Sequence, residues 1–195
     1  AWPVNLDGFE ALSFDCYGTL IDWEAGLVAV LREWATRRGL QMDDQALITA
    51  YSSHEVAAER SRPGDAYPHI LARSMRALGA ELGAEVTDAD ADALARSVPD
   101  WPAFPDSPDA LTALSERYML LILSNVDRVS FAASNERLGV EFTGILTAQD
   151  IGSYKPSPRN FDALGAEARR LGIGTGKLLH VAQSLFHDHV PAKKA

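Results

Sequence analysis

The fold is decided by residues 11–20, Ala11-Leu12-Ser13-Phe14-Asp15-Cys16-Tyr17-Gly18-Thr19-Leu20. The apolar run at 11–14 predicts a short buried strand that leads directly into an acidic side chain. The glycine that follows favours a turn. This segment therefore predicts a strand that delivers the Asp15 carboxylate to the edge of a sheet.

Two later apolar runs end in the same way. Residues 119–123 lead into Ser124, and residues 178–182 lead into Gln183. In open α/β sheets, ligands bind beyond the carboxyl ends of the strands. We therefore expect these side chains to converge on Asp15, and Lys155 to reach the same crevice from a loop rich in Gly, Ser and Pro.

The spacing of apolar residues changes along the chain. From residue 23 to about 97 it is helical, and residues 98–105 form a proline-rich connection that we interpret as a hinge. After residue 104, strands and helices alternate, which is typical of a parallel sheet covered by helices on both faces. We predict a doubly wound, Rossmann-like α/β core of residues 1–22 and 104–195, with an inserted helical cap at 23–103.

Composition narrows the function classes. The chain has 195 residues and a formal net charge of −9, which argues against nucleic acid as a partner. A small anionic substrate stays compatible, since one local Lys or Arg sets the potential inside a cleft. Cys16 is the only cysteine, so no intrachain disulfide forms, in keeping with a reducing cytoplasm. We expect no membrane span and no signal peptide, because long apolar stretches and a basic start are lacking.

Four segments together resemble the motifs of the haloacid dehalogenase superfamily. They are residues 14–20, residues 121–125, residues 153–156 (Ser-Tyr-Lys-Pro) and residues 182–188 (Ala-Gln-Ser-Leu-Phe-His-Asp), in the order of that family. The chain is most similar to the L-2-haloacid dehalogenase branch. Phosphatases of the superfamily carry a second Asp where this chain has Tyr17, and an acidic magnesium ligand where it has Gln183.

The resemblance implies a mechanism without a metal or cofactor. Asp15 would displace halide from carbon to form an ester, and water would then hydrolyse that ester. Lys155 would keep Asp15 ionised, because an opposite charge nearby favours a carboxylate. The implied catalytic residues are Asp15, Thr19, Ser124, Lys155 and Asp188, and the implied substrate-binding residues are Tyr17, Asn125 and Gln183.

The chain also departs from that branch. Its dehalogenases use an Arg on the second cap helix, and residues 46–51 contain none. Arg60, Arg62 and Arg73 are alternatives among which the sequence does not choose. Phe161 replaces a family Tyr. Family members continue with a further strand, so we expect either a missing end or a short member. The resemblance also implies a homodimer.

Local interpretations compete with several of these roles. Thr19 is also a candidate helix N-cap, and Cys16 is better explained by packing than by chemistry. His54 and Glu55 are interpreted as a solvated face of the cap.

Three functions remain open. The first is a metal-independent, dehalogenase-like hydrolase that uses Asp15. The second is a magnesium-dependent small-molecule phosphatase of the same superfamily. The third is a non-catalytic module that binds a carboxylate or a protein partner.

Overall fold

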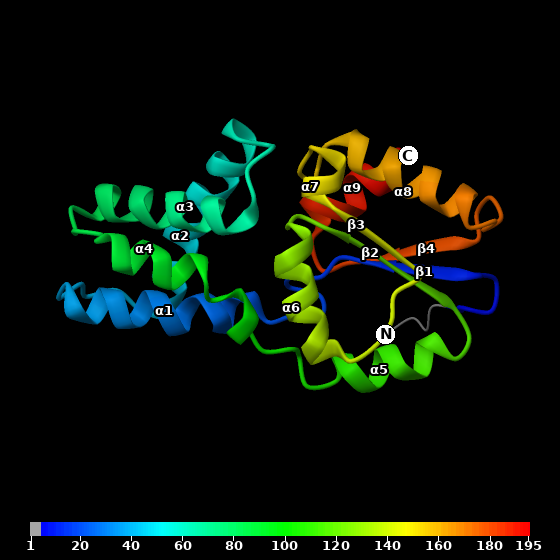
Figure 1. Ribbon diagram of the computed structural model, residues 1–195, viewed down its shortest axis with the longest axis horizontal. Coiled ribbons are helices and arrows are strands. Elements are labelled where there is room, and N and C mark those ends of the chain that lie inside the picture. Colours follow the sequence, from blue (N-terminus) through cyan, green and yellow to red (C-terminus); the bar gives the residue numbers. More distant parts are fainter. Residues whose placement is uncertain (1–4) are drawn as a thin grey trace.

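A four-stranded parallel sheet forms the centre of the computed structural model, which describes residues 5–195. The strand order is β3 (Gly144–Thr147), β2 (Met119–Ser124), β1 (Ala11–Phe14) and β4 (Leu178–Val181) (Figure 1). The expectation of no signal peptide falls in part on residues 1–4, which lie outside the described residues.

The register of the strands explains why distant residues meet. Phe14 at the end of β1 lies opposite Ile122 of β2 and Val181 of β4. All pairs are parallel, so their carboxyl ends point the same way. Asp15 follows this point directly, and its backbone N–H donates to Val181 O over 3.0 Å.

Helices cover both faces of the sheet (Figure 1). Leu12 and Ile122 pack in one buried cluster with residues of α5 (Ser107–Ser115) and α6 (Arg128–Leu138). Leu121 and Leu123 point the other way and pack on α8 (Pro158–Arg170). This alternation follows from the two-residue period of a strand. The predicted α/β class with a doubly wound parallel sheet is confirmed.

Four helices between β1 and α5 form a separate layer to one side, which we call the helical lobe (Figure 1). They are α1 (Trp23–Arg37), α2 (Asp44–Ser61), α3 (Tyr67–Leu82) and α4 (Asp88–Ala95). Three of these helices start at side chains that accept orphan backbone N–H groups, whereas α3 has no side-chain cap at its start and carries a proline in its first turn. Asp22 caps α1 and Asp43 caps α2, while Thr87 and Asp90 form a capping box on α4.

The lobe leaves and rejoins the core at neighbouring points. Asp22 N donates to Pro102 O over 2.8 Å, and Phe104 N donates to Leu20 O over 3.0 Å. Ile21 and Ala103 form an antiparallel bridge between the same two segments. The proline-rich connection thus contains a short 3₁₀ turn, η1 (Val98–Asp100), followed by a two-stranded neck.

Three elements were not predicted from the sequence, because they are too short to show a periodic pattern of apolar residues. They are α7 (Ala148–Ile151), the single π-helical turn η2 (Leu185–His189) and α9 (Val190–Ala192). Between residues 5 and 195, no helix combines the length and apolar character needed to cross a bilayer.

One close approach ties the neck to the lobe. A Cβ on Gly26 of α1 would overlap the indole ring of Trp101, which is fully buried. Gly26 therefore allows that ring to lie directly against the helix backbone. Gly165 in α8 differs, because a Cβ there would meet only Arg169 Nη1, at 3.6 Å.

These two glycines predict opposite effects of the same substitution. Gly26→Ala should destabilise the fold by about 1–3 kcal/mol, because it overpacks a filled site. Gly165→Ala should stabilise it by about 0.5–1 kcal/mol, because alanine restricts the unfolded chain and favours the helix. Urea unfolding followed by far-ultraviolet circular dichroism measures both. Equal effects of the two substitutions would contradict the packing argument.

Candidate active site

A buried ion cluster lies at the carboxyl edge of the sheet. Lys155 Nζ donates to Asp15 Oδ1 over 2.8 Å and to Asp188 Oδ1 over 2.6 Å. The three residues are 2%, 8% and 1% exposed, respectively. One ammonium is thus shared by two carboxylates that come from opposite ends of the chain.

The charges in this cluster stabilise one another. Burial alone lowers the pKa of Lys155, but Asp15 and Asp188 outweigh burial and raise it above its ordinary value. Burial likewise opposes ionisation of Asp188. The hydrogen bond from His180 and the charge of Lys155 still lower the Asp188 pKa below its usual range. The ionised forms of Lys155 and Asp188 are therefore the favoured ones.

Hydrogen bonds fix the orientation of each member. Thr19 Oγ1 donates to Asp15 Oδ2 over 2.9 Å and accepts from the backbone N–H of Gln183 over 3.0 Å. Asn125 holds the backbone of Lys155, accepting from its N–H over 2.6 Å and donating to its carbonyl over 3.1 Å. The alternative in which Thr19 caps a helix is wrong, because Asp22 caps α1.

A second line of polar residues supports Asp188 from behind. His180 Nε2 lies 2.8 Å from Asp188 Oδ1, and His180 Nδ1 lies 2.8 Å from Ser13 Oγ. His180 has no role among the residues predicted from the sequence. The alternating pattern of β1 and β4 could have indicated it, because Ser13 and His180 are paired in register.

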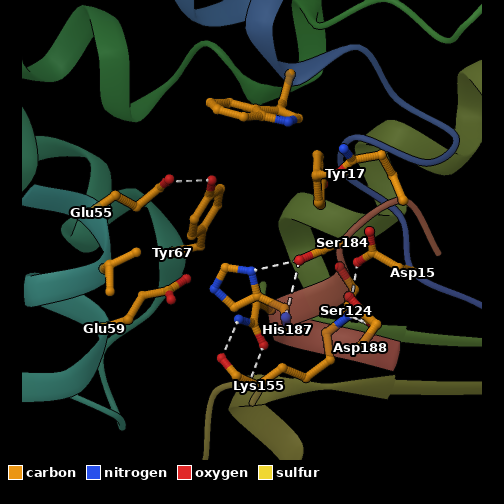
Figure 2. A pocket seen from close by; sticks show the side chains of 14 residues that line it. Asp15, Tyr17, Glu55, Glu59, Tyr67, Ser124, Lys155, Ser184, His187 and Asp188 are labelled. Atoms are coloured by element: carbon orange, nitrogen blue, oxygen red, sulfur yellow. Dashed lines mark hydrogen bonds and ion pairs between the residues drawn. The ribbon is translucent and has the colours of Figure 1, made fainter. Parts of the chain in front are cut away.

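The cluster opens into a cavity of about 290 Å³ between the sheet edge and the helical lobe. Figure 2 places Asp15, Ser124, Lys155 and Asp188 on one side. Ser124 Oγ is buried and has no hydrogen-bond partner among the described residues. It is therefore a free polar group at the wall of the cavity.

The opposite wall comes from α2 and α3. Glu55 and Glu59 project from α2 towards the cavity, and Tyr67 OH donates to Glu55 Oε1 over 2.7 Å (Figure 2). The interpretation of Glu55 as part of a solvated face is wrong, because Glu55 lines the cavity. Its neighbour His54 does not line the cavity and pairs with Glu81. Burial raises the pKa of Glu55 to about 7, despite its hydrogen bond from Tyr67. Burial and the nearby Glu55 raise the pKa of Glu59 well above its ordinary value.

The structure brings the predicted site residues together. Those that line the cavity are Asp15, Tyr17, Ser124, Asn125, Lys155, Gln183 and Asp188. Thr19 does not line the cavity itself, but its hydroxyl is hydrogen-bonded to Asp15, which does. Residues that the sequence analysis did not place there are Trp23, Glu55, Val56, Glu59, Tyr67, Ser184 and His187.

None of the three candidate replacements for the cap Arg lines this cavity, within the residues that the structure describes. Arg73 approaches Asp65, at 3.4 Å. Arg60 is exposed and lines an adjoining cavity that shares Glu59 with the first. Cys16 is fully buried in the core, as its packing interpretation predicted, and burial raises its pKa.

The donor set at the sheet edge does not suit magnesium. Over residues 5–195, no group of three or more His, Cys, Asp or Glu side chains is arranged to hold a metal ion. The third candidate donor is Gln183, a neutral amide, where a hard cation prefers anionic oxygen. The ammonium of Lys155 also lies between the two carboxylates that a metal would need.

One comparison with known proteins identifies a family. A model of the haloacid dehalogenase-like hydrolases matches residues 9–182. No curated protein sequence matches the chain.

Solved structures share the fold at low sequence identity. L-2-haloacid dehalogenase PA0810 is 24% identical with a TM-score of 0.77, covering 95% of this chain and 80% of its own. The L-2-haloacid dehalogenase from Xanthobacter autotrophicus is 19% identical with a TM-score of 0.78, covering 95% and 74%. The protein YfnB from Bacillus subtilis, bound to magnesium, is 18% identical with a TM-score of 0.77, covering 96% of this chain and 85% of its own. These likenesses establish the architecture.

Removing the shared ammonium should cost much of the stability. Lys155→Met leaves two buried carboxylates facing each other, so we expect a loss of about 3–5 kcal/mol at neutral pH. The loss should shrink as the pH falls towards 5, because protonation of one carboxylate relieves the repulsion. Urea unfolding at several pH values measures this. Lys193→Met, at an exposed lysine, is the control; a similar small effect of both would refute the coupling.

Glu55 should make stability depend on pH in the opposite sense from an ordinary paired carboxylate. Its folded pKa of about 7 lies above the ordinary 4.5, so unfolding releases a proton between these values. Stability should therefore fall as the pH rises through that window, by roughly 1–3 kcal/mol after allowance for partial exposure. In Glu55→Gln, which keeps the acceptor for Tyr67, this fall should be smaller than in wild type, and what remains belongs to Glu59, whose pKa is also raised. An unchanged pH profile would contradict the assignment.

Proposed function

Since the chain belongs to the haloacid dehalogenase-like hydrolases, we propose that it hydrolyses a small organic substrate through an ester formed on the Asp15 carboxylate. The observation that carries this proposal is the Lys155 ammonium, 2.8 Å from Asp15 Oδ1 at the wall of a cavity. An ion pair of this kind keeps a carboxylate anionic in a buried place, where it acts as a nucleophile.

The first step is a displacement at carbon. An oxygen of Asp15 forms a bond to the substrate carbon, and the bond from that carbon to the halogen breaks. Halide leaves with the bonding electron pair. Lys155 and Thr19 hold the two oxygens of Asp15 and so limit its rotation, which supports attack along a single direction.

The acidity of the Tyr17 hydroxyl bears on which leaving group the site can release. Burial raises the pKa of its hydroxyl well above the ordinary value, and the hydroxyl oxygen lies 2.8 Å from Ser134 Oγ. A hydroxyl so held is a poor acid at neutral pH. An alkoxide leaving group needs a proton and halide does not, so Tyr17 favours carbon–halide cleavage over phosphate-ester cleavage.

The second step is hydrolysis of the ester. Water adds to the carbonyl carbon of the Asp15 ester, the bond to the alkyl oxygen breaks, and the alcohol product and the free carboxylate result. Asp188 Oδ2 is buried and has no partner among the described residues, so we assign it to accept the proton of that water. The net reaction consumes one water and yields alcohol, halide and a proton.

The helical lobe completes the site in this proposal. Its helix α2 supplies the wall opposite Asp15 (Figure 2). A cavity closed by both parts of the chain would exclude bulk water during ester formation and so strengthen the charge interactions within. We propose that residues 23–103 act as this cap.

The proposed mechanism makes a prediction about oxygen isotopes. In a single turnover in ¹⁸O water, with protein in excess over a short-chain 2-haloacid, the label should enter the carboxylate of Asp15, because water attacks the ester carbonyl. Mass spectrometry of the peptide that contains Asp15 measures this. Label found only in the alcohol product would mean that water attacks the substrate directly.

Activity assays with variants accompany the isotope experiment. Asp15→Asn should lower halide release by about a thousandfold or more, since the nucleophile is lost, whereas Asp109→Asn, on the exposed face of α5, should leave it unchanged. A chelator should have no effect. Magnesium-dependent phosphate release from an aryl phosphate would support the phosphatase instead. Ligand binding that is equal in Asp15→Asn and wild type, with no turnover of any substrate, would support a non-catalytic module.

A further inference from the structure

The charges around the cavity do not match an anionic ligand. Among its 14 lining residues, all within the described chain, Lys155 is the only Lys or Arg. Its ammonium already contacts two carboxylates, Asp15 and Asp188. Glu55 and Glu59 add two more carboxyl groups on the far wall. An incoming carboxylate would therefore meet no unpaired cation.

Glu59 is a buried carboxyl group with no hydrogen-bond or ion-pair partner among the described residues. The residue is only 8% exposed, and Figure 2 shows its carboxyl group directed into the cavity. Within residues 5–195 it makes no hydrogen bond or ion pair, and only the more distant charges of Lys155 and Arg60 favour its ionised form. Buried carboxylates are normally paired. A ligand group that carries positive charge would supply the pair.

The spacing of Glu55 and Glu59 on α2 also favours a bound cation at this wall. Glu55 and Glu59 are one helical turn apart, and like charges at that spacing repel. Glu55 is held by Tyr67 OH at 2.7 Å, so its carboxyl group is oriented rather than free to turn away. A cation placed between the two would relieve the repulsion and gain an attraction to each.

Aromatic rings also line the cavity. Tyr17, Trp23 and Tyr67 line the cavity, and the ring centroids of Tyr17 and Tyr67 lie 6.1 Å apart with planes inclined at 34°. Aromatic rings combined with carboxylates recognise organic ammonium groups, because the ring face carries partial negative charge and tolerates the methyl groups of the cation. A hard metal ion is instead held by several oxygen ligands.

We propose that the half of the cavity formed by Glu55, Glu59, Tyr17, Trp23 and Tyr67 binds an organic ammonium group carried by the substrate. This inference rests on the proposed function, since it places the ammonium opposite the carbon that Asp15 attacks. The substrate class then becomes a cationic or zwitterionic molecule rather than a simple haloacid anion. Glu59 is the specificity-determining residue.

Binding of a non-reactive cation tests the proposal without turnover. Choline chloride is titrated into the whole protein in a calorimeter at about pH 8, where Glu55 is largely ionised. Other groups that titrate or carry charge also face Glu55 and Glu59, namely Tyr51, Tyr67, Arg60, Tyr154, Lys155 and His187. We expect saturable binding of choline, and binding about tenfold or more weaker for its uncharged tert-butyl analogue.

Two variants locate the binding. Glu59→Gln should weaken choline binding by about tenfold or more, because an amide of the same shape cannot ionise to pair with the ammonium. We expect this variant to fold, since the substitution removes no hydrogen bond or ion pair of the Glu59 side chain. Glu116→Gln removes the same charge from an exposed position after α5 and should bind choline as wild type does.

Three results would overturn the proposal: no choline binding, equal affinity for the uncharged analogue, or equal affinity in Glu59→Gln and wild type. Failure of this proposal and failure of the proposed function give different results. Choline binding without halide release from any substrate would leave the cation site standing and remove the hydrolytic mechanism. Halide release from simple haloacids without choline binding would do the reverse.

Discussion

The ammonium of Lys155 is the interaction on which the rest of the site depends. Two carboxylates at the edge of a buried sheet would repel each other and protonate, unless a cation lay between them. Lys155 supplies that cation at 2.8 Å and 2.6 Å. The contacts of Thr19, Asn125 and His180 are arranged around it, since each fixes one member of the cluster.

The sheet side of the site was predictable because its signals are local. A strand that ends in a polar residue is visible in the sequence, and parallel topology brings such ends together without knowledge of side-chain packing. Asp15, Ser124 and Gln183 were found in this way. Lys155 and Asp188 needed the resemblance to a family, since a loop lysine and an aspartate in a π-helical turn carry no pattern of their own.

The lobe side of the site was not predictable by the same reasoning. Glu55 and Glu59 occupy a helix whose charged residues suit water equally well, and only the placement of the lobe against the sheet turns that face inward. The role of His180 was not predicted for a related reason. It depends on hydrogen bonds to Asp188, eight residues away, and to Ser13 on the neighbouring strand. Sequence spacing reports which residues share a face but not what that face meets.

The paired neck of the lobe bears on the order in which the chain folds. β1 and β2 are neighbours in the sheet although the whole lobe separates them in sequence, and joining distant segments costs chain entropy that grows with the intervening length. Leu20 and Phe104 are already hydrogen-bonded at the neck, so a lobe that folds early behaves as a clip that makes the two strands effectively adjacent. In that order of folding, the insertion would nucleate the sheet that it interrupts.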